Sequence, residues 1–199
     1  MKKWVAVQIL QLLGWKIEGK RPQMQHCVMI AAPHTSNWDF PMMMLFTAAF
    51  ELKIRWMAKH SLFRPPLGFI MRALGGVPII RHRKSNMVTS MIEQFKKQEQ
   101  FILVVPAEGT RGRTEHWKSG FYHIAHGAGV PILLSYLDYS KKRGGFGPEV
   151  PTSGNIEADM DILRDFYAPM HGKFPDLSGP INLSEENPKL RNVFKREPD

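Results

Sequence analysis

Short runs of apolar residues recur along the chain, and their length and flanking breakers predict buried β-strands. The clearest run begins at Cys27 and ends directly before Pro33. The other runs are similar in length and lie between polar segments or glycines. The predicted strands cover residues 27–32, 53–57, 77–80, 101–105 and 130–136.

Between these runs, apolar positions at helical spacing predict helices. One such stripe, in a helix that begins near residue 85, consists of Val88, Met91, Ile92 and Phe95. Pro41 has no N–H group and fits only the first turn of a helix, so a helix is expected to begin near residues 38–40. The remaining predicted helices are a short apolar one within residues 61–76, one over 119–128 that stops at Gly129, and one over 156–168.

Strands that alternate with helices predict the α/β class, as a single domain with a mostly parallel central sheet flanked by helices. A chain of 199 residues with 43% hydrophobic content is long and apolar enough for one such domain. The expected organisation is an N-terminal amphipathic helix in residues 1–20, the domain over 21–168, and a Pro-rich, extended or partly disordered tail over 169–199. Residues 140–155, rich in Gly, Pro and Lys, are predicted to form a loop.

The first twenty residues allow two interpretations. A basic start is followed by an apolar stretch that ends at Trp15, with Gln8 and Gln11 on one helical face. Such a helix either lies in a membrane interface, with its lysines near lipid headgroups, or packs on the domain. No run of 18 or more apolar residues occurs, so a transmembrane helix is not expected, and no small-x-small cleavage site indicates a signal peptide.

Net charge and cysteine content narrow the surroundings of the protein. The formal net charge is +9, which favours polyanionic partners such as nucleic acid, anionic lipid or phosphorylated metabolites. The basic residues are scattered and no nucleic-acid-binding motif occurs, so nucleic acid is not an expected partner. Cys27 is the only cysteine, which indicates a reducing compartment. The histidines show no metal-ligand spacing, so no metal site is expected.

The first candidate for catalysis is the segment from His34 to Asp39. A histidine can take a proton from an alcohol, and it works best when a carboxylate orients its other ring nitrogen. Two residues five apart on an ideal helix diverge by about 140°. They can meet only if His34 lies in the turn after a strand and Asp39 in the first turn of the next helix. The alternative is a solvated turn with Asp39 as N-cap. Ser36 lies outside any Gly-x-Ser-x-Gly motif, so a serine hydrolase is disfavoured.

The second candidate is the tetrapeptide Glu108-Gly109-Thr110-Arg111, which follows the strand predicted over 101–105. Gly109 allows close approach of the backbone to a ligand, Thr110 offers a hydroxyl and an amide, and Arg111 can bind a phosphate with two hydrogen bonds. Glu108 could accept hydrogen bonds from substrate hydroxyls or hold Arg111. The alternative is a surface turn with a local ion pair.

Position in the predicted sheet connects the two motifs. Each follows a predicted strand directly, and in parallel sheets ligands bind beyond the carboxyl ends of the strands. Lys59 and Arg81 also follow predicted strands and could join the same anion site, although each alone is better explained as a solvated charge. The two motifs together therefore predict chemistry on a hydroxyl group attached to a phosphate.

These residues resemble the glycerolipid acyltransferases of the lysophosphatidic acid acyltransferase type. The resemblance consists of four blocks in a fixed order over about residues 25–140, which are His34 to Asp39, Gly76 to Arg81, Glu108 to Arg111, and Val130-Pro131-Ile132. The chain departs from the family pattern at Pro33, where asparagine is frequent, and at Ala107, where proline is usual. The long hydrophobic N-terminal anchor of many members is reduced to one short segment, which suggests a small peripheral branch.

The resemblance implies an O-acyltransferase in which His34 deprotonates the acceptor hydroxyl and Asp39 orients His34. The acyl group would come from an acyl thioester of coenzyme A or acyl carrier protein, without a cofactor. The residues implied to hold the phosphate-bearing lysolipid or glycerol phosphate are Glu108, Gly109, Thr110, Arg111, Arg81 and Lys59. We expect a cytoplasmic protein that associates peripherally with the inner face of a membrane, whose surface is anionic. A nucleic-acid- or lipid-binding module and a thioester hydrolase on the same scaffold stay open as alternatives.

Overall fold

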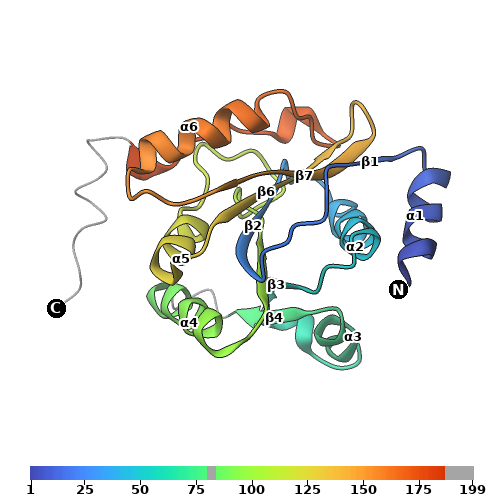
Figure 1. The fold of residues 1–199 in the computed structure, drawn as a ribbon, viewed down its shortest axis with the longest axis horizontal. Coiled ribbons are helices and arrows are strands. Elements are labelled where there is room, and N and C mark those ends of the chain that lie inside the picture. Colours follow the sequence, from blue (N-terminus) through green and yellow to red (C-terminus); the bar gives the residue numbers. More distant parts are fainter. Residues whose placement is uncertain (80–83, 187–199) are drawn as a thin grey trace.

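A seven-stranded sheet forms the centre of the molecule (Figure 1). The computed structural model describes residues 1–79 and 84–186. The strands lie in the order β1-β7-β6-β2-β5-β3-β4. Neighbours from β6 to β4 run parallel, whereas β7 runs antiparallel to β6 and parallel to β1. Their bounds are β1 Lys16–Glu18, β2 His26–Ala32, β3 Ile54–Lys59, β4 Gly76–Ile79, β5 Phe101–Val105, β6 Ile132–Asp138 and β7 Arg143–Val150. The prediction of an α/β domain with a mostly parallel sheet is confirmed.

Helices cover both faces of the sheet, which explains why its central strands are continuously apolar. All residues of β5 are buried, and those of β2 are buried or half-buried. One core layer joins the sheet to α4, α5 and α6, and the other joins it to α1, α2 and part of α3 (Figure 1). The helices are α1 Lys3–Leu12, α2 Asp39–Ala49, α3 Leu67–Ala73, α4 Lys84–Lys97, α5 Gly120–Ala128 and α6 Ile156–Tyr167. Short 3-10 turns are η1 His60–Phe63, η2 Pro175–Leu177 and η3 Ser184–Glu186.

The prediction of a loop over residues 140–155 is wrong, because β7 lies there. Arg143 donates to Asp138 of β6 across the hairpin at 3.1 Å. The glycines of β7 interrupt the alternation of apolar and polar residues by which a strand is recognised in a sequence. They also allow β1 to lie close to β7. A Cβ at Gly145 would lie 1.9 Å from the carbonyl oxygen of Glu18. Pairing with β1 and β6 therefore creates a strand from a segment that has little tendency to extend by itself.

The N-terminal helix α1 has one side against the domain and another side exposed. Its Ala6 and Leu10 are fully buried in the layer that includes α2, so the helix packs on the domain. On the outward side Trp4 is 71% exposed and Leu12 is 88% exposed. Within the part of the chain that the structure describes, no helix combines the length and apolar character needed to span a bilayer.

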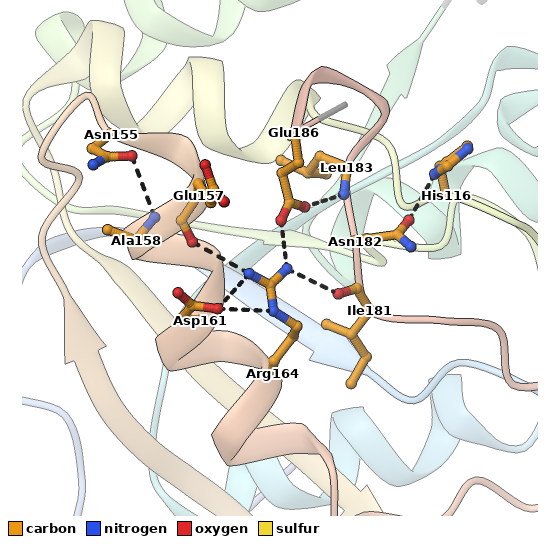
Figure 2. A network of polar contacts seen from close by, with 10 residues as sticks. All are labelled: His116, Asn155, Glu157, Ala158, Asp161, Arg164, Ile181, Asn182, Leu183 and Glu186. Carbon is orange, nitrogen blue, oxygen red and sulfur yellow. Dashed lines mark hydrogen bonds and ion pairs between the residues drawn. The ribbon is translucent and has the colours of Figure 1, made fainter. Parts of the chain in front are cut away.

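The segment after α6 lies against the domain as far as Glu186, in irregular conformation apart from η2 and η3. Arg164 of α6 holds it by donating to the Ile181 carbonyl and to the Glu186 carboxylate (Figure 2). Leu183 is buried and forms a bridge with Trp117. The predicted tail is thus in part an ordered covering of the domain, and residues 187–199 lie outside the described range.

Candidate active site

A cleft of about 900 Å³ opens at the carboxyl ends of β2 and β5. Its lining includes His34 and Asp39 from the first motif and Gly109, Thr110 and Arg111 from the second. Residues about 70 positions apart meet here because β2 and β5 are parallel neighbours, so their carboxyl ends lie at the same edge. The two motifs identified in the sequence therefore share one cleft.

His34 and Asp39 are in direct contact. His34 follows β2, Asp39 is the first residue of α2, and Nδ1 of the ring lies 3.0 Å from Oδ2 of the carboxylate. This is the arrangement that the spacing requires, a turn residue meeting a residue of the first helical turn. Because a carboxylate only accepts hydrogen bonds, the proton is on Nδ1. The other ring nitrogen, Nε2, is left as a proton acceptor.

The Asp39 carboxylate is held by donors on both of its oxygens. Oδ2 also accepts from the backbone N–H groups of Thr35 and Ser36, at 3.0 and 2.9 Å. Oδ1 accepts from the Tyr139 hydroxyl at 2.7 Å. Asp39 is only 6% exposed, so these bonds replace the hydration that burial removes from its carboxylate. The ring of His34 is thereby held in one orientation.

Glu108 supports the same turn from the other motif. One oxygen, Oε1, accepts from the backbone N–H of His34 at 3.0 Å. The other, Oε2, is buried and has no hydrogen-bond partner among the described residues. Burial raises the pKa of this carboxyl above its ordinary value, against the lowering effect of the His34 bond. Glu108 does not line the cleft, so its visible role is to tie the two motifs together.

The remaining residues of this motif form a tight turn at the cleft. Gly109 has φ of +68° and donates its N–H to the Pro106 carbonyl at 3.0 Å. This left-handed conformation suits glycine, and a Cβ here would lie 2.8 Å from Cγ of Lys118. The turn leaves Thr110 and Arg111 exposed at the cleft. A flexible cation next to backbone amides can bind an anionic group.

The two other predicted anion-binding residues, Lys59 and Arg81, have different outcomes. Lys59 is the last residue of β3, whose carboxyl end points toward the edge that holds the cleft. Arg81 lies outside the residues that the structure describes.

Apolar side chains form the deeper walls of the cleft. They come from α2 and from the region of η1 and α3. Met42 faces the core, whereas Met43, Phe46, Leu62 and Met71 line the cleft. The site can therefore hold an apolar chain beside a proton acceptor and an exposed cation.

Sequence reasoning missed two parts of the site. Tyr139 directly follows β6, and its position after a parallel strand was the signal that could have identified it. The segment 171–174 has no such signal. It contacts the His34 turn through the Phe174 N–H, which donates to Thr35 Oγ1 at 3.1 Å. Gly172 allows this close approach, because a Cβ there would lie 2.6 Å from Thr35 Oγ1. Across residues 1–79 and 84–186, no group of three or more His, Cys, Asp or Glu side chains is arranged to hold a metal ion.

An oriented His–Asp pair, an anion-binding turn and an apolar cleft at one sheet edge are typical of an α/β enzyme that acts on a substrate with polar and apolar parts. The family model described as Acyltransferase matches residues 15–134. This is more than half of the chain, so the chain belongs to the acyltransferase family and is an acyltransferase. The resemblance found in the sequence is confirmed at this level.

The fold is also similar to a solved structure, the 1-acyl-sn-glycerophosphate (LPA) acyltransferase PlsC from Thermotoga maritima. The TM-score is 0.56 at 19% sequence identity, over 83% of this chain and 73% of that chain. At this identity the likeness concerns the fold. No curated protein matches the chain.

Proposed function

We propose that this acyltransferase moves a fatty acyl group from an acyl thioester to the hydroxyl of a glycerol phosphate or lysophospholipid. The observation that carries the proposal is the contact between His34 Nδ1 and Asp39, 3.0 Å long, in a cleft that also holds Arg111. The printed description of the Thermotoga maritima neighbour, an acyltransferase for 1-acyl-sn-glycerophosphate, agrees with this acceptor class.

In the proposed reaction, His34 Nε2 takes the proton of the acceptor hydroxyl. The oxygen attacks the thioester carbonyl, the C–S bond breaks, and the thiolate leaves and takes up the proton from the imidazolium. Asp39 stabilises the positive ring that forms between these steps. No covalent intermediate with the enzyme and no cofactor is required, since coenzyme A or acyl carrier protein brings the acyl group as co-substrate.

The phosphate of the acceptor is assigned to the turn that contains Gly109, Thr110 and Arg111. Arg111 can form two charge-assisted hydrogen bonds with a phosphate, and the exposed side chain is free to close on it. Arg81 and Lys59 join this anion site by the family resemblance. Glu108 acts here by holding the His34 backbone. The apolar walls that include Met43 and Phe46 accept the acyl chain.

We also propose that the enzyme works at the anionic inner face of a membrane, as a peripheral cytoplasmic protein. Trp4 and Leu12 of α1 are exposed, and so is Phe69 of α3, at 80%. Both helices lie on the side of the sheet covered by α2, and Met71 of α3 lines the cleft, as does Leu62 of the preceding η1. Exposed apolar side chains near basic residues fit an anionic lipid surface.

Vesicle flotation tests the membrane proposal. Binding to phosphatidylglycerol vesicles is expected, with loss of binding when Phe69→Ser and Trp4→Ser are combined. The matched control is Ile162→Ser, because Ile162 is an exposed apolar residue of α6 in the opposite layer. Equal flotation of the double variant and the unmodified protein would contradict the proposed surface.

The catalytic proposal is tested with purified protein, an acyl-CoA and lysophosphatidate. Acceptor-dependent thiol release and formation of the diacylated product are expected, and His34→Ala should abolish both while circular dichroism stays unchanged. His126→Ala is the control, because His126 lies exposed on α5 away from the cleft. Thiol release without acylated product would instead support a thioester hydrolase, and substantial transfer by pure His34→Ala would refute the base assignment.

A further inference from the structure

We infer that Tyr139 is a positioning residue for the His34–Asp39 pair, whose hydroxyl fixes the plane of the Asp39 carboxylate against the ring of His34. The inference rests on the proposed function, in which His34 is the base. Tyr139 is not part of any of the four family motifs. It directly follows β6 and lies 100 residues from Asp39 in the sequence.

The two oxygens of Asp39 are held in different ways. Oδ2 accepts three hydrogen bonds, all from the turn that contains His34 itself. Oδ1 accepts from the Tyr139 hydroxyl at 2.7 Å. Without this bond, the turn alone would hold one oxygen and leave the other buried without its donor. The carboxylate could then tilt, and the ring that depends on it would lose its fixed orientation.

Tyr139 is itself held by two separate parts of the chain, the segment 171–174 and the residue after α1 that precedes β1, Trp15. Its backbone N–H donates to the His171 carbonyl at 2.9 Å, and its ring meets the Trp15 ring edge-on at 4.9 Å. The Lys173 ammonium lies 5.7 Å from the ring centroid. The phenol is therefore placed before any substrate binds. Burial and the neighbouring carboxylate raise the pKa of Tyr139 above its ordinary value, so the hydroxyl keeps its proton and stays a donor.

The structure contains a second contact of the same kind away from the cleft. Tyr122 of α5 donates to Asp159 of α6 at 2.7 Å, and Asp159 is also buried. Two donors from Ser153 complete its carboxylate. Replacing Tyr122 by Phe removes a matching tyrosine–aspartate hydrogen bond, together with the one that the Tyr122 hydroxyl accepts from the Gly154 N–H, and does not touch the cleft, so it serves as the control.

Loss of the Tyr139 hydroxyl has a directional effect on proton binding by His34. With one donor removed, more of the negative charge of Asp39 acts on the ring, which stabilises the protonated form. The acidic limb of the pH–rate profile should move to higher pH. The titratable and charged groups around the ring are Asp39, Glu108, Arg111, Tyr139 and Lys173. Four of these are common to the enzyme and the variant, so the difference reports on Tyr139.

The experiment compares Tyr139→Phe with Tyr122→Phe. For Tyr139→Phe we expect kcat to fall roughly tenfold, a part of the 10²–10⁴-fold that a general base contributes. KM should change little, and the acidic limb of kcat/KM should move to higher pH. An NMR titration of the His34 ring should show its midpoint moving in the same direction. Tyr122→Phe should leave both readouts unchanged.

A double-mutant cycle separates positioning from general packing. If Tyr139 acts through Asp39, Tyr139→Phe should cost little further activity in an Asp39→Asn background. Additive losses, an unmoved NMR midpoint, or an equal shift in Tyr122→Phe would overturn the inference. A different result would separate the two proposals. If the unmodified protein and all variants lack acyl transfer but the His34 midpoint still moves in Tyr139→Phe, the proposed function is refuted and the positioning of His34 through Tyr139 is supported.

Discussion

The sharpest test of the proposed chemistry is the replacement Asp39→Asn, which removes a charge and keeps the shape. The amide oxygen of Asn can occupy the place of Oδ2 and accept from Thr35, Ser36 and the His34 ring. The amide nitrogen then faces the Tyr139 hydroxyl, which can rotate and accept. The turn should therefore fold, while the ring loses the charge that stabilises its protonated form.

The size of the loss follows from the geometry of the pair. Two unit charges about 4 Å apart attract by ~1 kcal/mol in water and by ~4 kcal/mol at an effective dielectric constant of about 20. Asp39 is 6% exposed and the His34 side chain 22% exposed, so the attraction between them lies between these two values. We expect a loss of about 2–3 kcal/mol of transition-state stabilisation, or roughly 30- to 160-fold in kcat.

The assay is acceptor-dependent thiol release under saturating substrates, with thermal melting as the check on folding. Asp159→Asn is the control, because Asp159 is buried at the start of α6 and accepts hydrogen bonds from Tyr122 and Ser153. That variant should lose stability and keep kcat. A loss below about threefold in Asp39→Asn, less than 1 kcal/mol, would refute the role of the carboxylate charge.

Three further predictions concern the cleft and the C-terminal segment. Arg111→Ala should raise the KM for the phosphate-bearing acceptor at least about tenfold, through loss of charge-assisted bonds, and an unchanged KM in steady-state kinetics would argue against the phosphate site. Glu108 has a raised pKa in the fold, so its ionisation destabilises the protein as pH rises above the ordinary value of 4.5. Glu108→Gln should therefore gain stability relative to the unmodified protein as pH rises from 4.5 toward neutrality in urea unfolding; a difference that stays constant with pH would contradict this. Glu185 has its pKa lowered to about 2, chiefly by the bond with His123. The stabilising effect of the ionised carboxylate is present above pH 4.5 and disappears as pH falls toward 2. In urea unfolding, Glu185→Gln should therefore be less stable than the unmodified protein near neutral pH and equally stable at pH 2. A lower stability of the variant that persists at pH 2 would count against this origin.

The parts of the fold that local sequence specifies were predicted well. The buried strands β2 and β5 and the helix that starts near Pro41 match their apolar patterns to within two residues. Gly129 ends α5 in the left-handed conformation, with φ of +65°, as its position predicted. In each case the signal lies in residues a few positions apart, because burial on both faces or a helix stop depends on the segment itself.

The pairing of the two motifs was also predictable, by a rule of topology. Both follow strands, and parallel strands that are neighbours place their carboxyl ends at one edge. The role of Glu108 was not predictable. Whether it faces the cleft or the His34 backbone depends on the turn at Gly109 and on the burial of that turn, which the tetrapeptide alone does not specify.

The sequence by itself determined the α/β class, the residues with reactive side chains and the edge of the sheet where they gather. Only the tertiary structure decided that β1 pairs with β7, that Tyr139 reaches Asp39, and that segment 171–174 closes on Thr35. The physical reason is distance along the chain. A strand run or a helix stop is stabilised by neighbours in sequence, whereas these contacts join segments about 100 or more residues apart and exist only once the sheet has brought them together.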